Sequence, residues 1–447
     1  MDKIKVLFVS AELTPIIKVG GLADVAESLP KFLSKYIDIE IVIPKYKAIK
    51  EEVPFIQNTN VRIHYIDIPS YFSQRDNIYG YSDDSIRFAA FSRKVVDCIL
   101  NNQFGKVDII HVNDYHTSFI PLLIKDSGIE NIKTILTIHN LGIAYQGRYS
   151  IDILETLKLK HECQCILDDK KNHEINPLKQ GILHADIITT VSPTYAKEIL
   201  TPEYGAKLEK FLNKRKDSLY GILNGIDYSI FNPETDNKLY ANYNTSNYKD
   251  GKFRNKRLLL DEIRLNFNLD FILCSFISRL DYQKGIDILI ESIQKLENKN
   301  INFLILGTGS KEFEEQLKEL EIEDRNMFSE IIFDPVMAQR IYAASDILII
   351  PSRYEPSGLT QMIAMKYGTL PLVRATGGLK DSVNDMIDGF CFEDYSSDSL
   401  SKTINKAISL FKKDKWDKMI KNAMNKDFSW DKSSLEYLNL YKKLINQ

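Results

Sequence analysis

The fold is decided by the stretch IKVLFVSAELTPIIKVGGLADV at residues 4–25. Residues 4–10 form a short apolar run typical of a buried strand, and the apolar residues that end the stretch recur at helical spacing. A loop with Lys18, Gly20 and Gly21 therefore joins the end of a strand to the start of a helix. Free backbone N–H groups and the helix dipole favour an anion at such a point, and a lysine suits phosphate. A tight turn with a solvated lysine is the alternative.

Short apolar runs alternate with helical patterns through both halves of the chain. The runs are continuous rather than alternating, which is typical of strands covered on both faces in a parallel α/β sheet. We therefore predict an α/β protein with two doubly wound Rossmann-like domains, at residues 1–220 and 221–429. Polar, glycine-rich and ionisable residues follow the predicted strands, where open α/β sheets bind ligands. This pattern predicts a binding cleft between two facing domains.

The composition excludes several classes of partner. The chain has 447 residues, of which 27% are charged, and a formal net charge of −3, so no global attraction to nucleic acid or to a membrane is expected. It has no run of eighteen apolar residues, and the apolar run near its start is too short for a signal peptide. We expect a soluble, cytoplasmic protein. The spacing of the lysine loop is not the dinucleotide fingerprint Gly-x-Gly-x-x-Gly, which disfavours a nicotinamide or flavin cofactor.

The cysteines and histidines do not predict a metal site. Five cysteines, an odd number without a Cys-x-x-Cys pair, favour a reducing compartment and argue against structural zinc. Cys163 and Cys165 form the only close pair in the sequence, and an incidental loop pair is favoured over a redox site. His111 and His116 flank Asp114, but no third cluster completes a metal site. An Asp-x-Asp motif is also absent, so a metal-bridged nucleotide diphosphate is not expected.

Two pairs of residues at predicted strand ends could contact a ligand. Arg279 and Lys284 bracket a strand-to-helix loop and could clamp a diphosphate, the arginine by a forked contact and the lysine as a point charge. A salt bridge to Asp281 is the alternative. His139 and Asn140 follow another predicted strand, where an imidazole and an amide suit hydroxyl recognition. A purely structural histidine is the alternative there.

A further candidate loop is EPSGLT at residues 355–360, between an apolar strand and a helix. The N–H groups of Gly358, Leu359 and Thr360 are expected to face an anion at the start of this helix. Glu355 could accept hydrogen bonds from sugar hydroxyls or support a positive reacting centre. The alternative is a helix cap with an exposed acid.

Together these segments resemble the family of bacterial glycogen synthases and plant starch synthases, which are retaining glucosyltransferases of the two-domain GT-B fold. The resemblance covers nearly the whole chain, and each motif is weak alone but specific in this order and spacing. The motifs are KVGGLAD at 18–24, TIHNL at 137–141, LNGID at 223–227, SRL at 278–280, QKG at 283–285, PSRYEP at 351–356 and TGGL at 376–379.

The resemblance implies transfer of glucose to the non-reducing end of an α-1,4-glucan such as glycogen, with retention of configuration, from ADP-glucose in the bacterial branch. It implies no cofactor and no metal, and a last helix at 430–447 that returns to the first domain. The implied catalytic residues are Lys18, Arg279 and Lys284 on the diphosphate, and His139 and Glu355 on the transferred glucose. Those implied for substrate binding are Lys18, Gly20, Gly21, Asp24, Asp114, Asn140, Asn224, Phe333 against the nucleobase, Ser357, Gly358, Leu359 and Thr360.

The chain departs from the family pattern at four positions. Ser357 stands where many relatives have cysteine, and Asn113 and Tyr115 stand where many have histidine and tryptophan. Ile363 stands where many GT-B enzymes have a second glutamate that binds ribose. Two other functions stay open: a retaining GT-B transferase with a small acceptor, and a glucan-binding protein without catalysis, which would not need the three cations. The sequence does not predict the oligomeric state.

Overall fold

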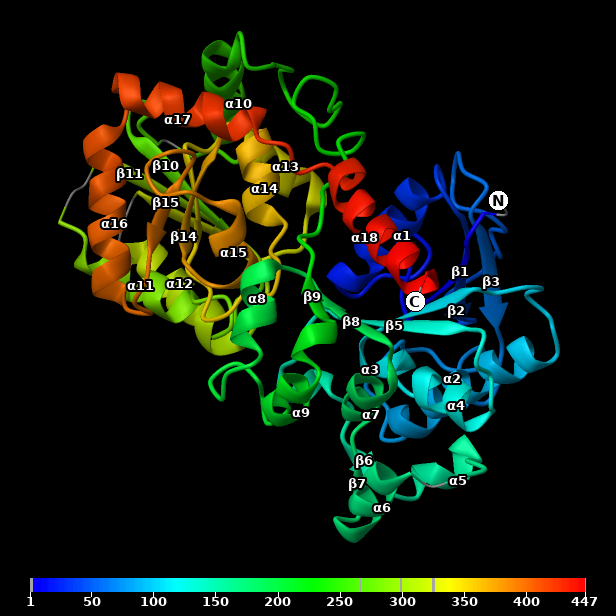
Figure 1. Ribbon diagram of the computed structural model, residues 1–447. Helices are drawn as coiled ribbons and strands as arrows, with labels where there is room; N and C mark the ends of the chain where they lie inside the picture. Colours follow the sequence, from blue (N-terminus) through cyan, green and yellow to red (C-terminus); the bar gives the residue numbers. More distant parts are fainter. Residues whose placement is uncertain (1–2, 162, 266, 298–299, 324–325, 447) are drawn as a thin grey trace. The chain divides into compact units, whose positions relative to one another are not determined.

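The computed structural model describes residues 3–161, 163–265, 267–297, 300–323 and 326–446 (Figure 1). The chain forms two compact units, Met1–Asn224 with Trp430–Gln447, and Gly225–Ser429. The first unit extends past the predicted boundary at residue 220, because that residue lies inside a strand, β9 (Leu219–Gly221), that pairs with the first sheet.

The first unit is built on a seven-stranded parallel sheet. Its order is β3-β2-β1-β4-β5-β8-β9, so the strand order reverses between β1 and β4. Strand β1 is buried from Val6 onward and β4 along its length, because most of their residues are apolar. Phe8 of β1 lies between Ile41 and His111 in register. The other strand bounds are β1 (Lys5–Val9), β2 (Asp38–Pro44), β3 (Arg62–Ile66), β4 (Ile109–Asn113), β5 (Lys133–Ile138) and β8 (Ile187–Thr190).

Helices surround this sheet and include the last helix of the chain. They are α1 (Gly21–Leu33), α2 (Asp84–Leu100), α3 (Asp114–Thr117), α4 (Ile120–Asp126), α5 (Ile153–Leu157), α6 (Gln164–Lys171), α7 (Pro177–His184), α8 (Pro193–Glu198), α9 (Glu209–Lys214) and α18 (Trp430–Ile445). A short hairpin, β6 (Tyr149–Ser150) and β7 (Glu174–Ile175), and two 3₁₀ turns, η1 (Ile143–Tyr145) and η2 (Lys216–Ser218), complete the unit. Helix α18 packs against α1, and the Tyr441 hydroxyl lies 2.7 Å from Nδ1 of His111 on β4.

The second unit has a six-stranded parallel sheet of order β12-β11-β10-β13-β14-β15, which reverses between β10 and β13. Its strands are β10 (Ile272–Ile277), β11 (Ile301–Leu306), β12 (Met327–Glu330), β13 (Ile347–Ile350), β14 (Leu370–Arg374) and β15 (Phe390–Phe392). Its helices are α10 (Tyr248–Glu262), α11 (Ile286–Lys295), α12 (Lys311–Glu323), α13 (Pro335–Ala344), α14 (Thr360–Lys366), α15 (Gly377–Ser382), α16 (Ser397–Leu410) and α17 (Asp414–Asn425). Both sheets are parallel, as the continuous apolar runs predict.

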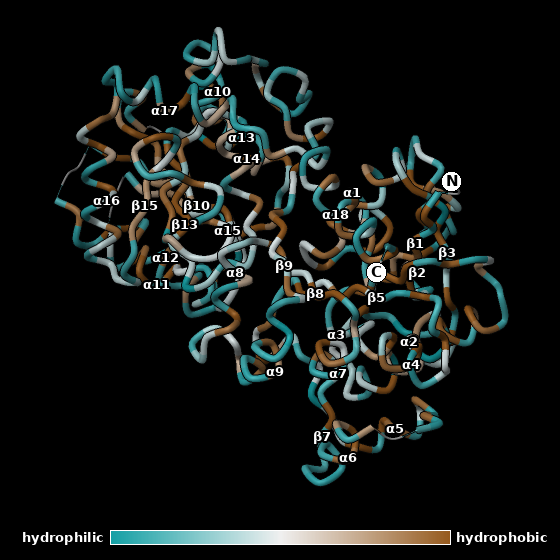
Figure 2. Tube along the Cα trace, in the orientation of Figure 1, coloured by the Kyte–Doolittle hydropathy of each residue, from teal (hydrophilic) through white to brown (hydrophobic). Residues whose placement is uncertain are grey.

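The apolar residues concentrate along the strands, as Figure 2 shows in brown for β10 and β13. Strand β11 is buried at all six positions, which requires helices on both faces of its sheet. None of the helices in the described parts of the chain is long and apolar enough to cross a membrane.

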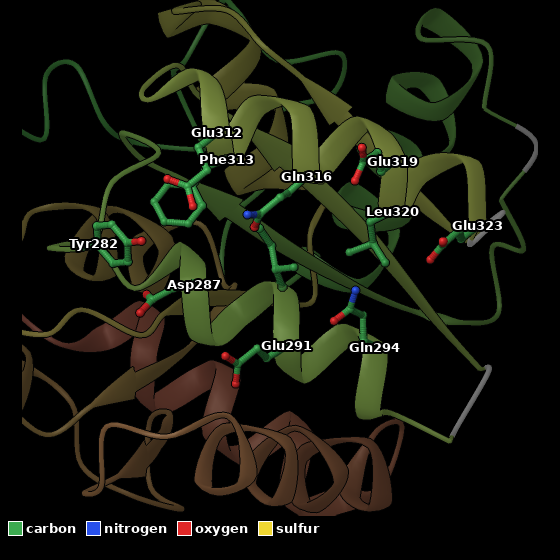
Figure 3. Close-up of a pocket in the computed structure, with 11 residues that line it drawn as sticks. Tyr282, Asp287, Glu291, Gln294, Glu312, Phe313, Gln316, Glu319, Leu320 and Glu323 are labelled. Carbon is green, nitrogen blue, oxygen red and sulfur yellow. The ribbon is translucent and has the colours of Figure 1, made fainter.

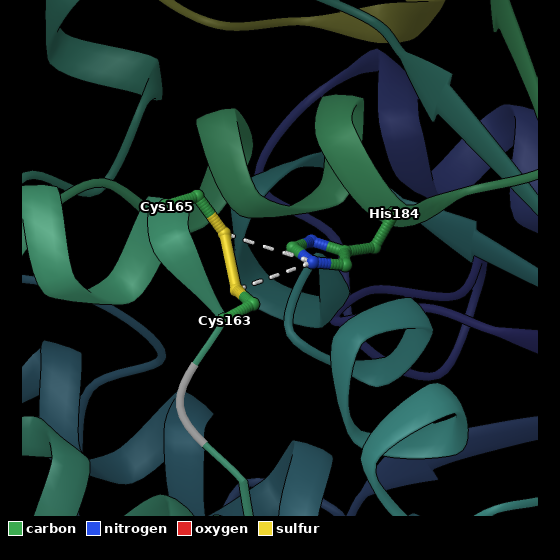
Figure 4. A group of neighbouring side chains, drawn as sticks. All are labelled: Cys163, Cys165 and His184. Atoms are coloured by element: carbon green, nitrogen blue, oxygen red, sulfur yellow. Dashed lines mark hydrogen bonds between the residues drawn. A yellow bond between two sulfur atoms is a disulfide. The ribbon is translucent and has the colours of Figure 1, made fainter.

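One prediction about the cysteines is wrong. Cys163 and Cys165 are joined by a disulfide, with Cα atoms 5.5 Å apart, where the sequence suggested an incidental pair (Figure 4). Cys163 is the N-cap of α6 and Cys165 lies in its first turn, so the backbone brings the two side chains within bonding reach. The pattern of odd cysteines could not show this, because the pairing depends on where helix α6 begins.

Candidate functional site

Predicted site residues of the first unit gather where its strand order reverses. Ligands of open α/β sheets bind outside the carboxyl ends of strands at such a point. The loop after β1 carries Lys18 and Gly20, β4 is followed by Asp114, and β5 is followed by His139. Because β1, β4 and β5 are neighbours in the sheet, the structure brings these loops to one sheet edge.

The lysine loop already contains an anion, which the sequence did not predict. Oε2 of Glu12 accepts hydrogen bonds from the backbone N–H groups of Val19 (2.7 Å) and Gly20 (2.8 Å). Oε1 of the same carboxylate accepts one from the Tyr79 hydroxyl at 2.8 Å, and Glu12 is only 4% exposed. The expectation that these N–H groups bind a ligand anion is therefore corrected: Glu12 takes them and fixes the loop. The sequence feature that could have indicated this contact is Glu12 itself, an acid soon after the first strand and in the same loop as Gly20.

Lys18 is paired with Asp24 in the first turn of α1. Its Nζ lies 2.6 Å from Oδ1 and 2.8 Å from Oδ2 of Asp24, and the Thr14 hydroxyl also donates to Oδ1 at 2.9 Å. Gly20 is the N-cap of α1 and Gly21 its first residue. Since both charged side chains are partly exposed, the ammonium group can reach a phosphate while Asp24 keeps Thr14 as a partner.

Asp114 is a buried acid with a strained backbone. Its φ of 53° lies in the left-handed region, which a residue with a side chain adopts only when its surroundings hold it there. Oδ1 accepts a hydrogen bond from the N–H of His139 at 2.8 Å. Burial raises the pKa of Asp114 to about 7, although hydrogen bonds from the backbone of His139 and Asn140 act in the opposite direction. The Asp114 carboxyl can therefore hold or release a proton near neutral pH.

His139 is held as a neutral hydrogen-bonding group. Its Nε2 lies 2.9 Å from Oδ1 of Asn113, whose own amide group donates to the carbonyl of Val9 at 3.0 Å. Because an amide oxygen only accepts, Nε2 carries the proton and Nδ1 keeps a free lone pair. Burial lowers the pKa of His139 to about 3, which keeps the ring uncharged at neutral pH. Asn113, a departure from the family pattern, is thus the residue that orients this imidazole.

Two buried histidines, His111 and His116, and the partly buried His139 predict that acid destabilises the first unit. Burial lowers the pKa of His111, His116 and His139 from 6.5 to about 3, so the unfolded chain takes up their protons as pH falls below 6.5. Asp114 acts in the opposite direction. Because its pKa is raised from 3.8 to about 7 in the folded unit, its contribution to the free energy of unfolding falls as pH rises through this range. These four groups together give a net uptake of about two protons near pH 5, which corresponds to a slope of about 3 kcal/mol per pH unit. The lowered pKa of His184 acts in the same direction.

Urea unfolding at several pH values between 5 and 7.5 measures this slope. Trp430 reports on the first unit when Trp416, the other tryptophan, is replaced by phenylalanine. His139→Gln removes one of the titrating groups and should lower the slope by about one proton, or about 1.4 kcal/mol per pH unit. A free energy of unfolding that does not change over this range would contradict the prediction.

The second unit places an ion pair where its own strand order reverses. Lys284 follows β10, Glu355 follows β13, and Nζ of Lys284 lies 2.6 Å from Oε2 of Glu355. The Ser352 hydroxyl donates to the same oxygen at 3.0 Å. Glu355 is only 7% exposed, so the alternative of an exposed helix-capping acid is wrong. Two charged groups from separate loops therefore meet at the point where this sheet type binds ligands.

A small cavity surrounds this ion pair. Its volume is about 70 Å³, and its lining includes Lys284, Glu355, Gly358, Leu359 and Thr360. Gly358 adopts a positive φ of 67°, which favours glycine in this turn. The structure thus gathers most of the predicted residues of this unit around one hollow. Ser357 lies in the same turn, with its hydroxyl directed to the carbonyl of Gly358 at 3.5 Å.

The glycine pair after β14 supports this turn. The N–H of Gly378 donates to the carbonyl of Glu355 at 3.0 Å. A Cβ on Gly377 would lie 1.9 Å from the Glu355 carbonyl oxygen, and one on Gly378 would lie 1.9 Å from that of Ser357. The motif is more than a strand-to-helix turn, since only glycine lets it approach the backbone of the Glu355 loop.

Three other predicted residues do not line this cavity. Arg279 is 57% exposed at its side chain and pairs with Asp281 at 3.0 Å, which is the alternative that the sequence left open. Phe333, with 83% of its surface exposed, does not line the cavity. Asn224 is the last residue of the first unit, and its buried Oδ1 has no hydrogen-bond partner in the described part of the chain. Their roles stay predictions.

A larger hollow lies between α11 and α12, as Figure 3 shows. Its volume is about 470 Å³, and carboxylates dominate its lining. Of the residues in the Arg279–Lys284 loop, it includes only Tyr282, and it includes none of the predicted site residues. The acids that line it are Asp287, Glu291, Glu312, Glu319 and Glu323. Because these acids would repel a diphosphate, the size of a hollow alone does not identify the site.

Comparison with known proteins gives a consistent family. Residues 5–214 match the starch synthase catalytic domain, and residues 261–426 match glycosyl transferases group 1. The glycogen synthase of Thermodesulfovibrio yellowstonii is 40% identical, with 99% of this chain and 98% of the relative covered. The glycogen synthase of Clostridium kluyveri is also 40% identical, over 99% of this chain and 100% of the relative.

Solved structures agree with these relatives. The catalytic domain of starch synthase IV from Arabidopsis thaliana, bound to ADP and acarbose, superposes with a TM-score of 0.88 at 32% identity over 100% of both chains. Sucrose-phosphate synthase from Thermosynechococcus elongatus has a TM-score of 0.65 at 16% identity, covering 99% of this chain and 100% of that one, which shows a shared fold. The predicted GT-B fold class is confirmed by these neighbours. The chain belongs to the glycogen synthase and starch synthase family.

Proposed function

We propose that this protein is a glycogen synthase that transfers glucose from ADP-glucose to the non-reducing end of an α-1,4-glucan, with retention of configuration. The observation that carries the proposal is the pair of the partly buried Lys284 with the buried Glu355 in a small cavity. The names of the relatives support the reaction, and the ADP bound to the starch synthase structure supports an adenine nucleotide. We expect the reaction in the cytoplasm, with no metal and no other cofactor.

In this proposal the second unit binds the donor. Lys284 and Arg279 bind the diphosphate, and the N–H groups around Gly358 and Thr360 add hydrogen bonds to it. Positive groups that stabilise a leaving diphosphate lower the barrier for cleavage of the glucosyl bond without a metal ion. Glu355, freed from Lys284 when the diphosphate takes that contact, then faces the positive anomeric carbon. The exposed ring of Phe333 would stack on the nucleobase.

In this proposal the first unit supplies further contacts to the substrates. Lys18 exchanges part of its contact with Asp24 for a phosphate oxygen, while Glu12 keeps the loop in place. His139 and Asn140 bind glucose hydroxyls as neutral groups. The low pKa of His139 suits it to this role, because it keeps the ring uncharged. Asp24 and Asp114 contact the donor or the acceptor, and the unpartnered Oδ1 of Asn224 accepts a further sugar hydroxyl.

The experiment that tests the proposal is incorporation of labelled glucose into glycogen from ADP-glucose and from UDP-glucose, without added metal. We expect incorporation from ADP-glucose, with a KM for the donor that rises at least tenfold in Lys18→Ala, since one charged contact to a phosphate contributes about 1.5–3 kcal/mol. Lys35→Ala is the matched control, because Lys35 is also a half-exposed lysine paired with an aspartate, Asp431.

The outcomes separate the alternatives. Incorporation that prefers UDP-glucose would overturn the proposed donor. Transfer to a small sugar acceptor but not to glycogen would favour a retaining transferase of another specificity. Binding of glycogen by folded protein without any transfer would favour a glucan-binding protein.

A further inference from the structure

A cluster of metal-ligating side chains lies away from the proposed catalytic groups (Figure 4). Nε2 of His184, the last residue of α7, lies 3.7 Å from Sγ of Cys163 and 3.7 Å from Sγ of Cys165 at the start of α6. The three ligand atoms all lie within 4.8 Å of one another. Figure 4 shows the imidazole directed at the two sulfur atoms.

A second residue fixes the imidazole in the orientation that a metal requires. Nδ1 of His184 lies 2.8 Å from the backbone carbonyl oxygen of Gln180, one turn earlier on α7. Because a carbonyl only accepts hydrogen bonds, Nδ1 carries the proton, and the lone pair of Nε2 faces the sulfurs. Metal-binding histidines characteristically donate their other N–H to a carbonyl or carboxylate in this way.

Gln180 is itself held in place and contacts one of the sulfurs. Its side-chain Nε2 donates to Oδ2 of Asp169 at 2.7 Å, and its Oε1 lies 3.5 Å from Sγ of Cys165. Asp169 in turn pairs with Lys179. The side chains around the cluster therefore form a connected set that joins α6 to α7, rather than three independent surface groups.

We propose that Cys163, Cys165 and His184 bind a zinc ion when the cysteine pair is reduced. Two thiolates and one imidazole are a ligand set that suits zinc and does not suit magnesium or calcium, which take oxygen ligands. A dithiol reductant converts the disulfide to two thiols and is itself oxidised to a disulfide. Zinc then displaces the two thiol protons, and the fourth position of a tetrahedral ion is open to water or another ligand.

The proposed ion would fasten helix α6 onto α7. Helix α7 packs against α3 and α4, and a Cβ on Gly181 would lie only 2.9 Å from the side chain of Ser118, so α7 fits tightly there. Helix α3 begins with Asp114. Zinc would therefore stabilise the layer beneath a proposed site residue without contacting the substrates.

The test uses the full-length chain, reduced with a phosphine that is then removed, and titrated with Co²⁺ as a spectroscopic probe for zinc. We expect one Co²⁺ per chain, with intense thiolate-to-metal charge transfer and the visible bands of a tetrahedral ion, and competition by one equivalent of Zn²⁺. Cys163→Ser and His184→Gln should each weaken binding at least tenfold, in line with the usual cost of a lost ligand or its support. Cys391→Ser is the control, because Cys391 is a partly buried free cysteine of the second unit.

Two results would overturn the proposal. One is a reduced chain that binds no stoichiometric Co²⁺ or Zn²⁺, which would leave the pair as a disulfide only. The other is binding that survives in both Cys163→Ser and His184→Gln. A melting temperature that rises with Zn²⁺ for the reduced native chain, but not for His184→Gln, would independently support it, and it would do so whether or not the protein transfers glucose.

Discussion

Glu355→Ala is expected to lower kcat for glucose transfer by about 10²–10³-fold, since a charged group aimed at the developing charge of a transition state contributes about 3–4 kcal/mol. The buried carboxylate is the only acid that lines the cavity with Lys284, as far as the chain is described. The KM for the donor should change little, because Lys284 loses its internal partner and still binds the diphosphate. Initial rates at saturating glycogen measure both constants.

Two further variants make this result specific. Glu355→Gln keeps the shape and the hydrogen bond from Ser352 but removes the charge, so it should lose nearly as much activity. Glu291→Ala removes an acid from the larger hollow between α11 and α12 and should leave kcat unchanged. If Glu355→Gln retained kcat within twofold of the native value, Glu355 would have no electrostatic role in the reaction.

Gly377→Ala is expected to cost the second unit about 2–4 kcal/mol of stability, because overpacking and a left-handed backbone each penalise a side chain. The added Cβ would lie 1.9 Å from the Glu355 carbonyl oxygen, and the φ of Gly377 is 47°. Since the clash moves the backbone of Glu355, activity should also fall, by at least tenfold for a displacement of about 1 Å.

Thermal unfolding followed through Trp416, with Trp430 replaced by phenylalanine, measures the stability of this unit. Glucose transfer at a temperature where the variant is folded measures the second effect. Gly21→Ala is the control for an added methyl group, because its Cβ would meet no atom within 4 Å and its backbone is helical. Since Gly21 lies in the first unit, its effect is measured through Trp430. A Gly377→Ala variant with native melting temperature and native rate would show that the TGGL turn does not position Glu355.

The fold was predictable because its signal is local and repeated. Continuous apolar runs such as those of β4 and β11 specify buried parallel strands, and the residues after them specify which loops face a ligand. Lys284 and Glu355 could be selected individually for this reason. Their contact could not, since it depends on β10 and β13 being neighbours although 71 residues separate the two side chains.

What escaped prediction depends on contacts between loops. The sequence predicts that the N–H groups at this glycine-rich helix start bind an anion of a ligand. Those of Val19 and Gly20 instead donate to Glu12 of the same loop. The left-handed backbone of Asp114 is not visible in the sequence, because most aspartates are not left-handed although aspartate adopts this conformation more often than most residues. The Cys163–Cys165 disulfide likewise depends on the exact start of a short helix.

The place of α18 in the first unit has a consequence for synthesis on the ribosome. Trp430, Tyr437 and Tyr441 belong to the same hydrophobic core as the strands near the amino terminus. Domains generally fold as units in the order in which they emerge, but here the part that emerges first lacks a piece of its interior until residues 430–445 have been made. The second unit has all of its own residues earlier, by Ser429. The nascent chain therefore has all the residues of the second unit before it has all those of the first, which is complete only once α18 has been made.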